Sequence, residues 1–185
     1  MRRLKVITDQ EILGKMGLSQ AKPRLTARAV VVNRRGEIAV MYAGKFNLYS
    51  LVGGGIEEGE DALTALRREV YEETGCTCDG IMELGAVEEN RGSCDYTQIS
   101  YYYVVYTDTE ALSPHLTDGE KRNDTTVQWH SLEDAYGLIA SPRHPTVQRM
   151  YLQARDVAAL DAYRTFYPEN NIRRERHGKN NQLYH

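Results

Sequence analysis

The feature that most constrains the fold is residues 54–76, which read GGIEEGEDALTALRREVYEETGC. The glycines at its start predict a loop whose backbone can come close to a ligand. Asp61 is a favoured N-cap residue and Gly75 a favoured helix stop, so a helix should run between them. Apolar residues recur within it at helical spacing and should face the core. They are Ala62, Leu63, Leu66 and Val70.

Three carboxylates share one face of this predicted helix. Glu69 lies three residues before Glu72 and four before Glu73, and both spacings place side chains side by side on a helix. Unpaired carboxylates would repel one another, so the arrangement favours a bound cation, and oxygen ligands suit Mg²⁺ or Mn²⁺ rather than zinc. Arg68 could pair with Glu72 or hold another carboxylate. The alternative is a solvated acidic helix face, as in most glutamate-rich helices.

The same run resembles the Nudix box, Gly-x5-Glu-x7-Arg-Glu-U-x-Glu-Glu-x-Gly-U, where U is an aliphatic residue. The one departure is Cys76 at the last U position, where a buried cysteine behaves as a small hydrophobe. The resemblance covers roughly residues 25–139. The fixed positions are all matched, by Gly54, Glu60, Arg68, Glu69, Glu72, Glu73 and Gly75.

The resemblance implies a reaction and a set of roles. Nudix enzymes cut the pyrophosphate bond of a nucleoside diphosphate linked to another moiety, using Mg²⁺ and water. By position, the metal ligands would be the Gly53 carbonyl with Glu69, Glu72 and Glu73, and Mn²⁺ could replace Mg²⁺. Gly54 and Glu60 would support the loop. The implied catalytic residues are Glu72, Glu69 and Arg68.

Further candidates lie outside the box. Several Nudix members use an additional acidic residue as a metal ligand or base, and we expect one of a set of acidic residues here to face the metal, namely Glu88, Glu89, Glu120 and Asp124. Each of them alone is more simply interpreted as a solvated loop charge. Basic side chains could meet phosphate, and a tyrosine could stack on a base. The preferred acidic candidates are Glu120, Asp124 and Glu89, and the substrate-binding candidates are Arg28, Lys45 and Tyr49.

The order of the predicted elements is that of an α+β fold, and the Nudix resemblance implies an α/β/α sandwich with a mixed β-sheet. We divide the chain into an N-terminal extension (1–24), a Nudix hydrolase domain with a C-terminal helix (25–167) and a polar tail (168–185). Residues 97–107 are apolar on both faces, which predicts a central strand. The predicted strands are 25–32, 37–42, 47–52, 81–88, 97–107 and 125–130, and the predicted helices outside the box are 8–16, 131–139 and 146–163.

Composition limits the kinds of partner that we expect the chain to bind. The formal net charge of −3 and the pI near 6.0 provide no general attraction to nucleic acid or to an anionic membrane. Three cysteines do not form a disulfide framework, and we see neither a signal peptide nor a membrane span. These features predict a cytoplasmic protein, and the Nudix resemblance implies an enzyme with a nucleotide-type small-molecule substrate. A homodimer stays open.

The substrate is less well defined than the reaction. The sequence markers of several Nudix subfamilies are missing downstream of the box, which leaves a generic MutT-like enzyme for a nucleoside triphosphate or a nucleotide-sugar type of substrate. One alternative is a non-catalytic Nudix domain that binds a nucleotide or RNA as a regulatory module. Another is an mRNA decapping enzyme that holds RNA with basic residues at 173–179. The three intact carboxylates favour catalysis.

Overall fold

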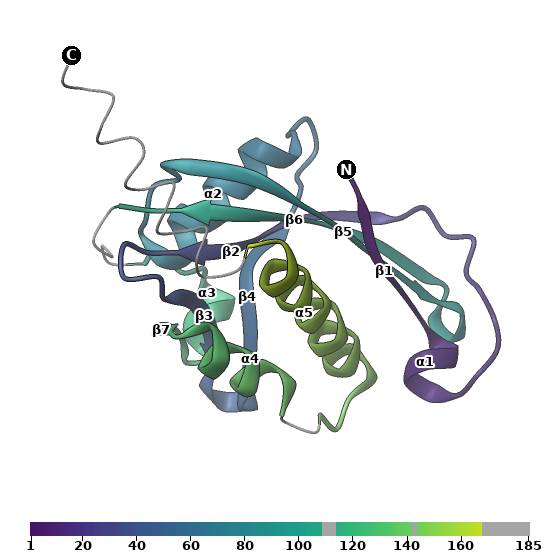
Figure 1. Ribbon diagram of the computed structural model, residues 1–185. Coiled ribbons are helices and arrows are strands. Elements are labelled where there is room, and N and C mark those ends of the chain that lie inside the picture. The colour runs from purple at the N-terminus through teal and green to yellow at the C-terminus, as the bar shows by residue number, and fades with distance from the viewer. Residues whose placement is uncertain (109–113, 142–143, 168–185) are drawn as a thin grey trace, which may run out of the picture.

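One mixed sheet of seven strands organises the protein (Figure 1). The computed structural model describes residues 1–108, 114–141 and 144–167. The strand order is β1-β5-β6-β2-β4-β3-β7, with β1 parallel to β5, β2 parallel to β6 and the other neighbours antiparallel. The strands are β1 (Arg3–Thr8), β2 (Arg24–Val32), β3 (Ile38–Ala43), β4 (Leu48–Gly55), β5 (Gly80–Arg91), β6 (Tyr96–Tyr106) and β7 (Thr125–His130).

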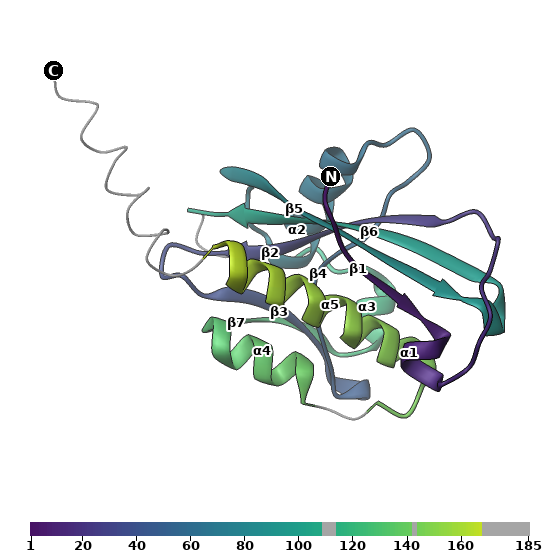
Figure 2. The ribbon, with the colours of Figure 1, turned by 45° about the vertical axis from the view of Figure 1, so that its right-hand side comes forward.

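Helices cover both faces of the sheet, as the sandwich prediction requires. Helix α2 packs on one face, and α4 and α5 pack on the other (Figures 1 and 2). Within the described residues, no helix is both long enough and apolar enough to cross a membrane. The helices are α1 (Asp9–Leu13), α2 (Ala62–Thr74), α3 (Asp118–Arg122), α4 (Leu132–Ala140) and α5 (Val147–Phe166), with short 3₁₀ turns at η1 (Gly44–Phe46) and η2 (Gly92–Cys94).

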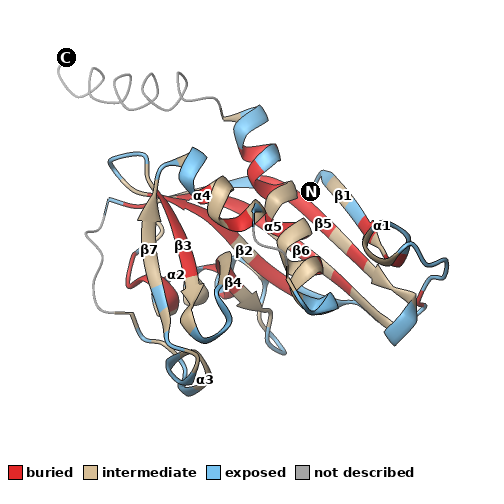
Figure 3. Ribbon diagram, turned by 90° about the horizontal axis from the view of Figure 1, so that it is seen from below, coloured by how far each residue is buried: buried red, intermediate tan, exposed pale blue. Residues whose placement is uncertain are grey.

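Strand β6 is the two-sided central strand that its sequence predicts. Tyr102 and Val104 pack into the core beneath α5, whereas Tyr103 and Val105 pack into the core beneath α2. All four side chains are at most 4% exposed. The buried colouring of the central strands in Figure 3 follows from this cover on both faces.

Helix α2 begins and ends where the sequence predicts. The Asp61 carboxylate accepts a hydrogen bond from the Thr64 amide at 2.8 Å, and Gly75 ends the helix in the left-handed conformation with φ of 71°. The predicted apolar stripe is wrong at one position: Leu63 is 45% exposed, and Ala65 is buried in its place. The stripe is therefore turned slightly around the helix from the one predicted.

Strand β1 was missed by the sequence analysis. It pairs with residues 86–90 of β5 at the edge of the sheet and buries Ile7 completely. Its basic side chains hide the strand pattern, although charges are common on edge strands. Helix α1 is shorter than predicted because Gly14 ends it with φ of 68°. The guanidinium of Arg2 lies over the Phe166 ring, 4.3 Å from its centroid, at the end of α5.

Other predictions need smaller changes. The remaining six strands lie close to their predicted positions, with β4 continuing into the glycine loop and β5 continuing to Arg91. The last helix continues past its predicted end to Phe166. Helix α3 was not predicted. The predicted polar tail at 168–185 lies outside the described residues.

We expect Ile7→Ala to lower the free energy of unfolding by about 2–5 kcal/mol, because it leaves a cavity under β1. Val6→Ala on the same strand is the matched control: Val6 is 41% exposed, so its truncation should cost about 0.5 kcal/mol or less. Chemical denaturation of the full chain measures both. Equal losses for the two variants would contradict the packing of β1 into the core.

Candidate active site

The glycines at the end of β4 bring backbone and carboxylate together. Gly53 has φ of 128°, and a Cβ atom there would lie 2.4 Å from the Ala27 carbonyl oxygen of the neighbouring strand. A Cβ atom on Gly54 would lie 2.4 Å from Oε1 of Glu69. Only glycine allows the α2 carboxylate to rest directly on the loop backbone.

Arg68 is the centre of the charged cluster. Its Nε and Nη2 atoms donate to the two carboxylate oxygens of Glu60, each at 3.0 Å, and Nη2 also donates to the Gly55 carbonyl at 3.0 Å. Its Nη1 atom contacts Glu69 at 2.7 Å and Glu72 at 3.4 Å. These hydrogen bonds lower the pKa of Glu60 and raise that of Arg68. One guanidinium thus fixes three carboxylates and the loop.

Glu73 is held separately and is buried. It is 8% exposed and accepts a hydrogen bond from the Gly53 amide at 2.7 Å. Burial raises the pKa of Glu73 to about 8, against the opposing effects of the Gly53 amide and the charge of Arg28. Burial also raises the pKa of Glu69, and Arg68 opposes that shift. Without a bound cation, burial therefore favours the protonated form of Glu73 beside the Gly53 amide.

The donor set fits a divalent cation in its chemistry. It consists of hard carboxylate oxygens next to a backbone carbonyl, which Mg²⁺ and Mn²⁺ prefer. In the described part of the chain, no three acidic, His or Cys side chains converge as a ready metal cluster. Arg68 and the Gly53 amide hold the carboxylates instead. The ligands that would hold a metal are Glu69, Glu72, Glu73 and the Gly53 carbonyl.

Among the acidic candidates outside the box, Glu120 interacts electrostatically with Glu73. Its charge raises the pKa of that carboxyl further. Its carboxylate also closes a capping box with Thr117, accepting from the amide and the hydroxyl at 2.7 Å each. Asp124 is exposed at the turn after α3, with φ of 53°, and its carbonyl accepts a hydrogen bond from Gly44.

Glu89 needs a correction. We interpreted it as a loop charge that could face the metal, but it is 1% exposed and belongs to a network on the α5 face of the sheet. It accepts hydrogen bonds from Arg155 at 3.2 Å and Gln98 at 3.3 Å, and it pairs with Arg91. These partners commit its carboxylate to the network, so we withdraw it as a metal ligand.

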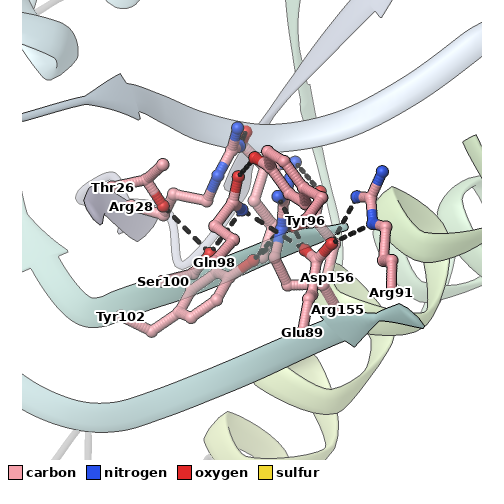
Figure 4. Close-up of polar contacts among 11 residues, drawn as sticks. Thr26, Arg28, Glu89, Arg91, Tyr96, Gln98, Ser100, Tyr102, Arg155 and Asp156 are labelled. Carbon is pink, nitrogen blue, oxygen red and sulfur yellow. Dashed lines mark hydrogen bonds and ion pairs between the residues drawn. The ribbon is translucent and has the colours of Figure 1, made fainter. Parts of the chain in front are cut away.

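We call this set of side chains the α5-face polar network (Figure 4). Sequence reasoning missed it, because Arg155 and Asp156 resemble the polar face of an amphipathic helix. Two buried nitrogen atoms, Nε of Arg28 and Nη2 of Arg155, have no hydrogen-bond partner among the described residues. The members are Thr26, Arg28, Glu89, Arg91, Tyr96, Gln98, Ser100, Tyr102, Arg155 and Asp156.

The substrate-binding candidates occupy different environments. Arg28 is partly buried, and its Nη1 atom donates to the Leu51 carbonyl at 3.1 Å. Tyr49 stacks on Tyr42 of the adjacent strand, with ring centroids 4.5 Å apart. Lys45 is exposed in the turn η1. The tyrosine pair is a feature that sequence analysis found only in part, because pairing across strands depends on register.

We expect Glu73→Gln to stabilise the metal-free protein at alkaline pH. The folded-state pKa of Glu73 is about 8, above its ordinary value of 4.5, so folding favours the protonated form. The native protein should therefore lose stability as pH rises from about 4.5 to about 8. The glutamine variant lacks this loss, and its amide oxygen can still accept from Gly53.

Thermal unfolding without metal at about pH 5 and about pH 9 measures this effect, with the variant several degrees more stable only at the higher pH. The matched control is Glu58→Gln, at an exposed carboxylate of the same loop. A difference between Glu73→Gln and the native protein that does not change with pH would contradict the assignment.

Comparison with known proteins adds a partial sequence relative. The chain is 44% identical over 55 residues to an RNA pyrophosphohydrolase of Bartonella bacilliformis. That match covers 25% of this chain and 32% of the relative, so it spans about a third of the relative's length.

Solved structures share the fold. The MutT NUDIX hydrolase of Burkholderia pseudomallei aligns with a TM-score of 0.50 over 73% of this chain and 98% of its own. The MutT protein of Methanosarcina mazei Go1 aligns at 0.51 over 74% and 95%. The NUDIX domain of Shewanella oneidensis NrtR, complexed with ADP ribose, aligns at 0.52 over 73% and 88%. Each is 20% identical to this chain, which supports likeness of fold alone.

The family model described as the NUDIX domain matches residues 22–154, which include the glycine loop, α2 and every strand except β1. The chain therefore belongs to the NUDIX domain family.

Proposed function

We propose that this chain is a Mg²⁺- or Mn²⁺-dependent pyrophosphohydrolase that acts on a nucleoside diphosphate derivative, of the nucleoside triphosphate or nucleotide-sugar type. The observation that carries the proposal is the clamp of Arg68 on Glu60, Glu69 and Glu72 beside the glycine loop. A chain that only bound nucleotide would have no need to gather mutually repelling carboxylates at one loop.

The proposed roles follow from the contacts. A bound divalent ion would neutralise the negative charge of the pyrophosphate. Glu69 is fixed by Arg68, which Glu60 holds in turn, so the ligand's orientation is set before substrate arrives. Glu72 is the more open carboxylate, with its side chain 37% exposed and 3.4 Å from Arg68. It is our candidate for taking the proton of the attacking water as the water oxygen bonds to phosphorus and the anhydride P–O bond breaks.

Glu120 is the candidate for an additional acidic group at this site. Its charge acts on Glu73. Its carboxylate is held by Thr117, so it would have to leave the cap of α3 to bind a metal directly. We therefore assign it first an electrostatic role beside Glu73, and a ligand role only when α3 rearranges.

Support for a nucleotide-type substrate comes from the spacing along β4. Tyr49 and Gly53 are four residues apart on one strand, about 13 Å at the usual rise, and alternate side chains share a face. A base stacked at the Tyr42–Tyr49 pair could thus extend its phosphates toward the glycine loop. Arg28, which pairs with Gly53 across β2 and β4, could contact the phosphates, whereas Lys45 lies in η1 beyond the tyrosine pair and could contact the base or sugar end. The NrtR domain that shares this fold is complexed with ADP ribose.

The test is a panel of nucleoside triphosphates, nucleotide sugars and dinucleotides with Mg²⁺, in which released phosphate is measured after a coupling pyrophosphatase or phosphatase. For the best substrate, Glu72→Gln should lower kcat about 100-fold or more, as expected for a lost general base or ligand. Its unfolding temperature should stay near that of the native protein. Glu58→Gln is the control and should keep full turnover.

Turnover of Glu72→Gln within a few-fold of the native protein would remove Glu72 from the chemistry. Tight binding of a nucleotide without hydrolysis anywhere in the panel would favour the alternative of a regulatory binding module.

Metal should stabilise the folded chain, because a bound cation offsets the cost of burying the ionised carboxylates whose pKa values are raised. At about 100 times its dissociation constant, a ligand of the folded state adds about 2.7 kcal/mol of stability. For a chain of this size we expect a rise in unfolding temperature of about 5–10 °C. A Glu69→Gln, Glu72→Gln double variant should lose the rise. An unchanged unfolding temperature of the native protein in saturating Mg²⁺ and Mn²⁺ would contradict the metal site.

A further inference from the structure

Three ionisable side chains from three different elements hold the backbone of β4 at the start of the glycine loop and just before it. Asp156 on α5 accepts a hydrogen bond from the Leu51 amide at 2.9 Å. Arg28 on β2 donates to the Leu51 carbonyl at 3.1 Å. Glu73 on α2 accepts from the Gly53 amide at 2.7 Å. Leu51 is separated by one residue from the Gly53 carbonyl that we propose as a metal ligand.

Asp156 is itself held in place from the side away from β4. The Tyr102 hydroxyl donates to its Oδ1 atom, and Arg155 Nε lies 3.4 Å from the same oxygen. Arg155 also donates from Nε to the Tyr102 hydroxyl at 3.1 Å and from Nη1 to the Glu89 carboxylate at 3.2 Å. Asp156 is fully buried, so solvent does not compete for these bonds (Figure 4). Its two oxygens therefore join a rigid network to the β4 backbone.

Packing alone does not explain these charges. Apolar side chains of similar volume would fill the space between a helix and a sheet, often with a gain in stability, because burying charges costs solvation. Part of this interface is indeed apolar, with Ile7, Leu160 and Tyr163 in the same core. Among the buried charged groups of the α5-face polar network, Asp156 and Arg28 contact β4, at the residue that leads into the loop. A carboxylate at this place determines the position of the strand backbone in a way that an apolar side chain cannot.

We propose that Asp156 is a positioning residue for the metal-binding loop: it acts through the Leu51 amide to set where the Gly53 carbonyl lies. The proposal rests on the function proposed above. Partners in the outer shell of a metal site commonly change metal affinity 10- to 100-fold when they are removed. Displacement of a reacting group by about 1 Å can cost as much in rate.

The test measures binding of Mn²⁺ alone to the full chain by electron paramagnetic resonance, together with thermal unfolding. Asp156→Ala should raise the Mn²⁺ dissociation constant about 10-fold or more. Asp156→Asn keeps an oxygen that can accept from Leu51, and it should restore the affinity to within about 3-fold of the native value. Rescue by the amide would separate backbone positioning from the loss of a buried charge.

Tyr151→Phe is the matched control. It removes another buried hydrogen bond of α5, in which the Tyr151 hydroxyl donates to Asp9 at 2.9 Å, on the side of the helix that faces α1. It should lower stability without changing Mn²⁺ affinity. If Asp156→Ala does not fold, Tyr102→Phe replaces it, because this variant removes the hydroxyl that holds Asp156 and should weaken Mn²⁺ binding about 3-fold or more.

Mn²⁺ binding by Asp156→Ala, or by Tyr102→Phe where it replaces that variant, that is as tight as binding by Tyr151→Phe would overturn the proposal. The outcome is independent of the proposed activity. A native chain that binds Mn²⁺ but hydrolyses nothing in the panel would reject the hydrolase and still allow the positioning role to be measured. A native chain that hydrolyses nucleotides, with an Asp156→Ala variant of unchanged Mn²⁺ affinity and kcat, would reject the positioning role alone.

Discussion

The two-oxygen contact of Arg68 with Glu60 is the interaction on which the site depends. Glu69, Glu72 and Glu73 lie within one turn of α2, and like charges at such spacing destabilise a helix. Arg68 pairs with two of these carboxylates through Nη1, and Glu60 binds Nε and Nη2 along one edge of the guanidinium, so the arginine cannot simply turn out into solvent. A lysine could supply the charge but not this planar geometry. The loop, the helix and the carboxylates are therefore one mechanical unit.

Local sequence signals explain why much of this unit could be predicted. Asp61 and Gly75 act on their own helix ends, so the limits of α2 follow from nearby residues. The alternation of β6 likewise records its two buried faces. Strand β1 escaped prediction because it is a short edge strand of six residues, and its basic side chains mask the one fully buried Ile7. Its pairing with β5 depends on contacts about 80 residues away in the chain.

The α5-face polar network shows the limit of such reasoning more clearly. Glu89, Arg155 and Asp156 each have a residue type that is normally exposed, and nothing adjacent in the sequence indicates burial. Arg155 and Glu89 are 66 residues apart, and only the folded sheet brings them together. The same holds for Glu120, whose influence on Glu73 requires α3 to lie beside the box. Sequence identifies residues that carry a motif, whereas their charged surroundings are a property of the tertiary fold.

The contact between Arg2 and Phe166 brings the start of β1 next to the end of α5. The first and last segments of the described fold therefore lie side by side, although they are far apart along the chain. Circular permutation becomes feasible for such a topology: a short flexible linker can join the two ends, and new termini can be opened in an exposed turn such as that at Arg34 and Arg35. A permuted chain would keep the glycine loop and α2 contiguous, and β1, α1 and β2 would leave the ribosome after α5 instead of before α2.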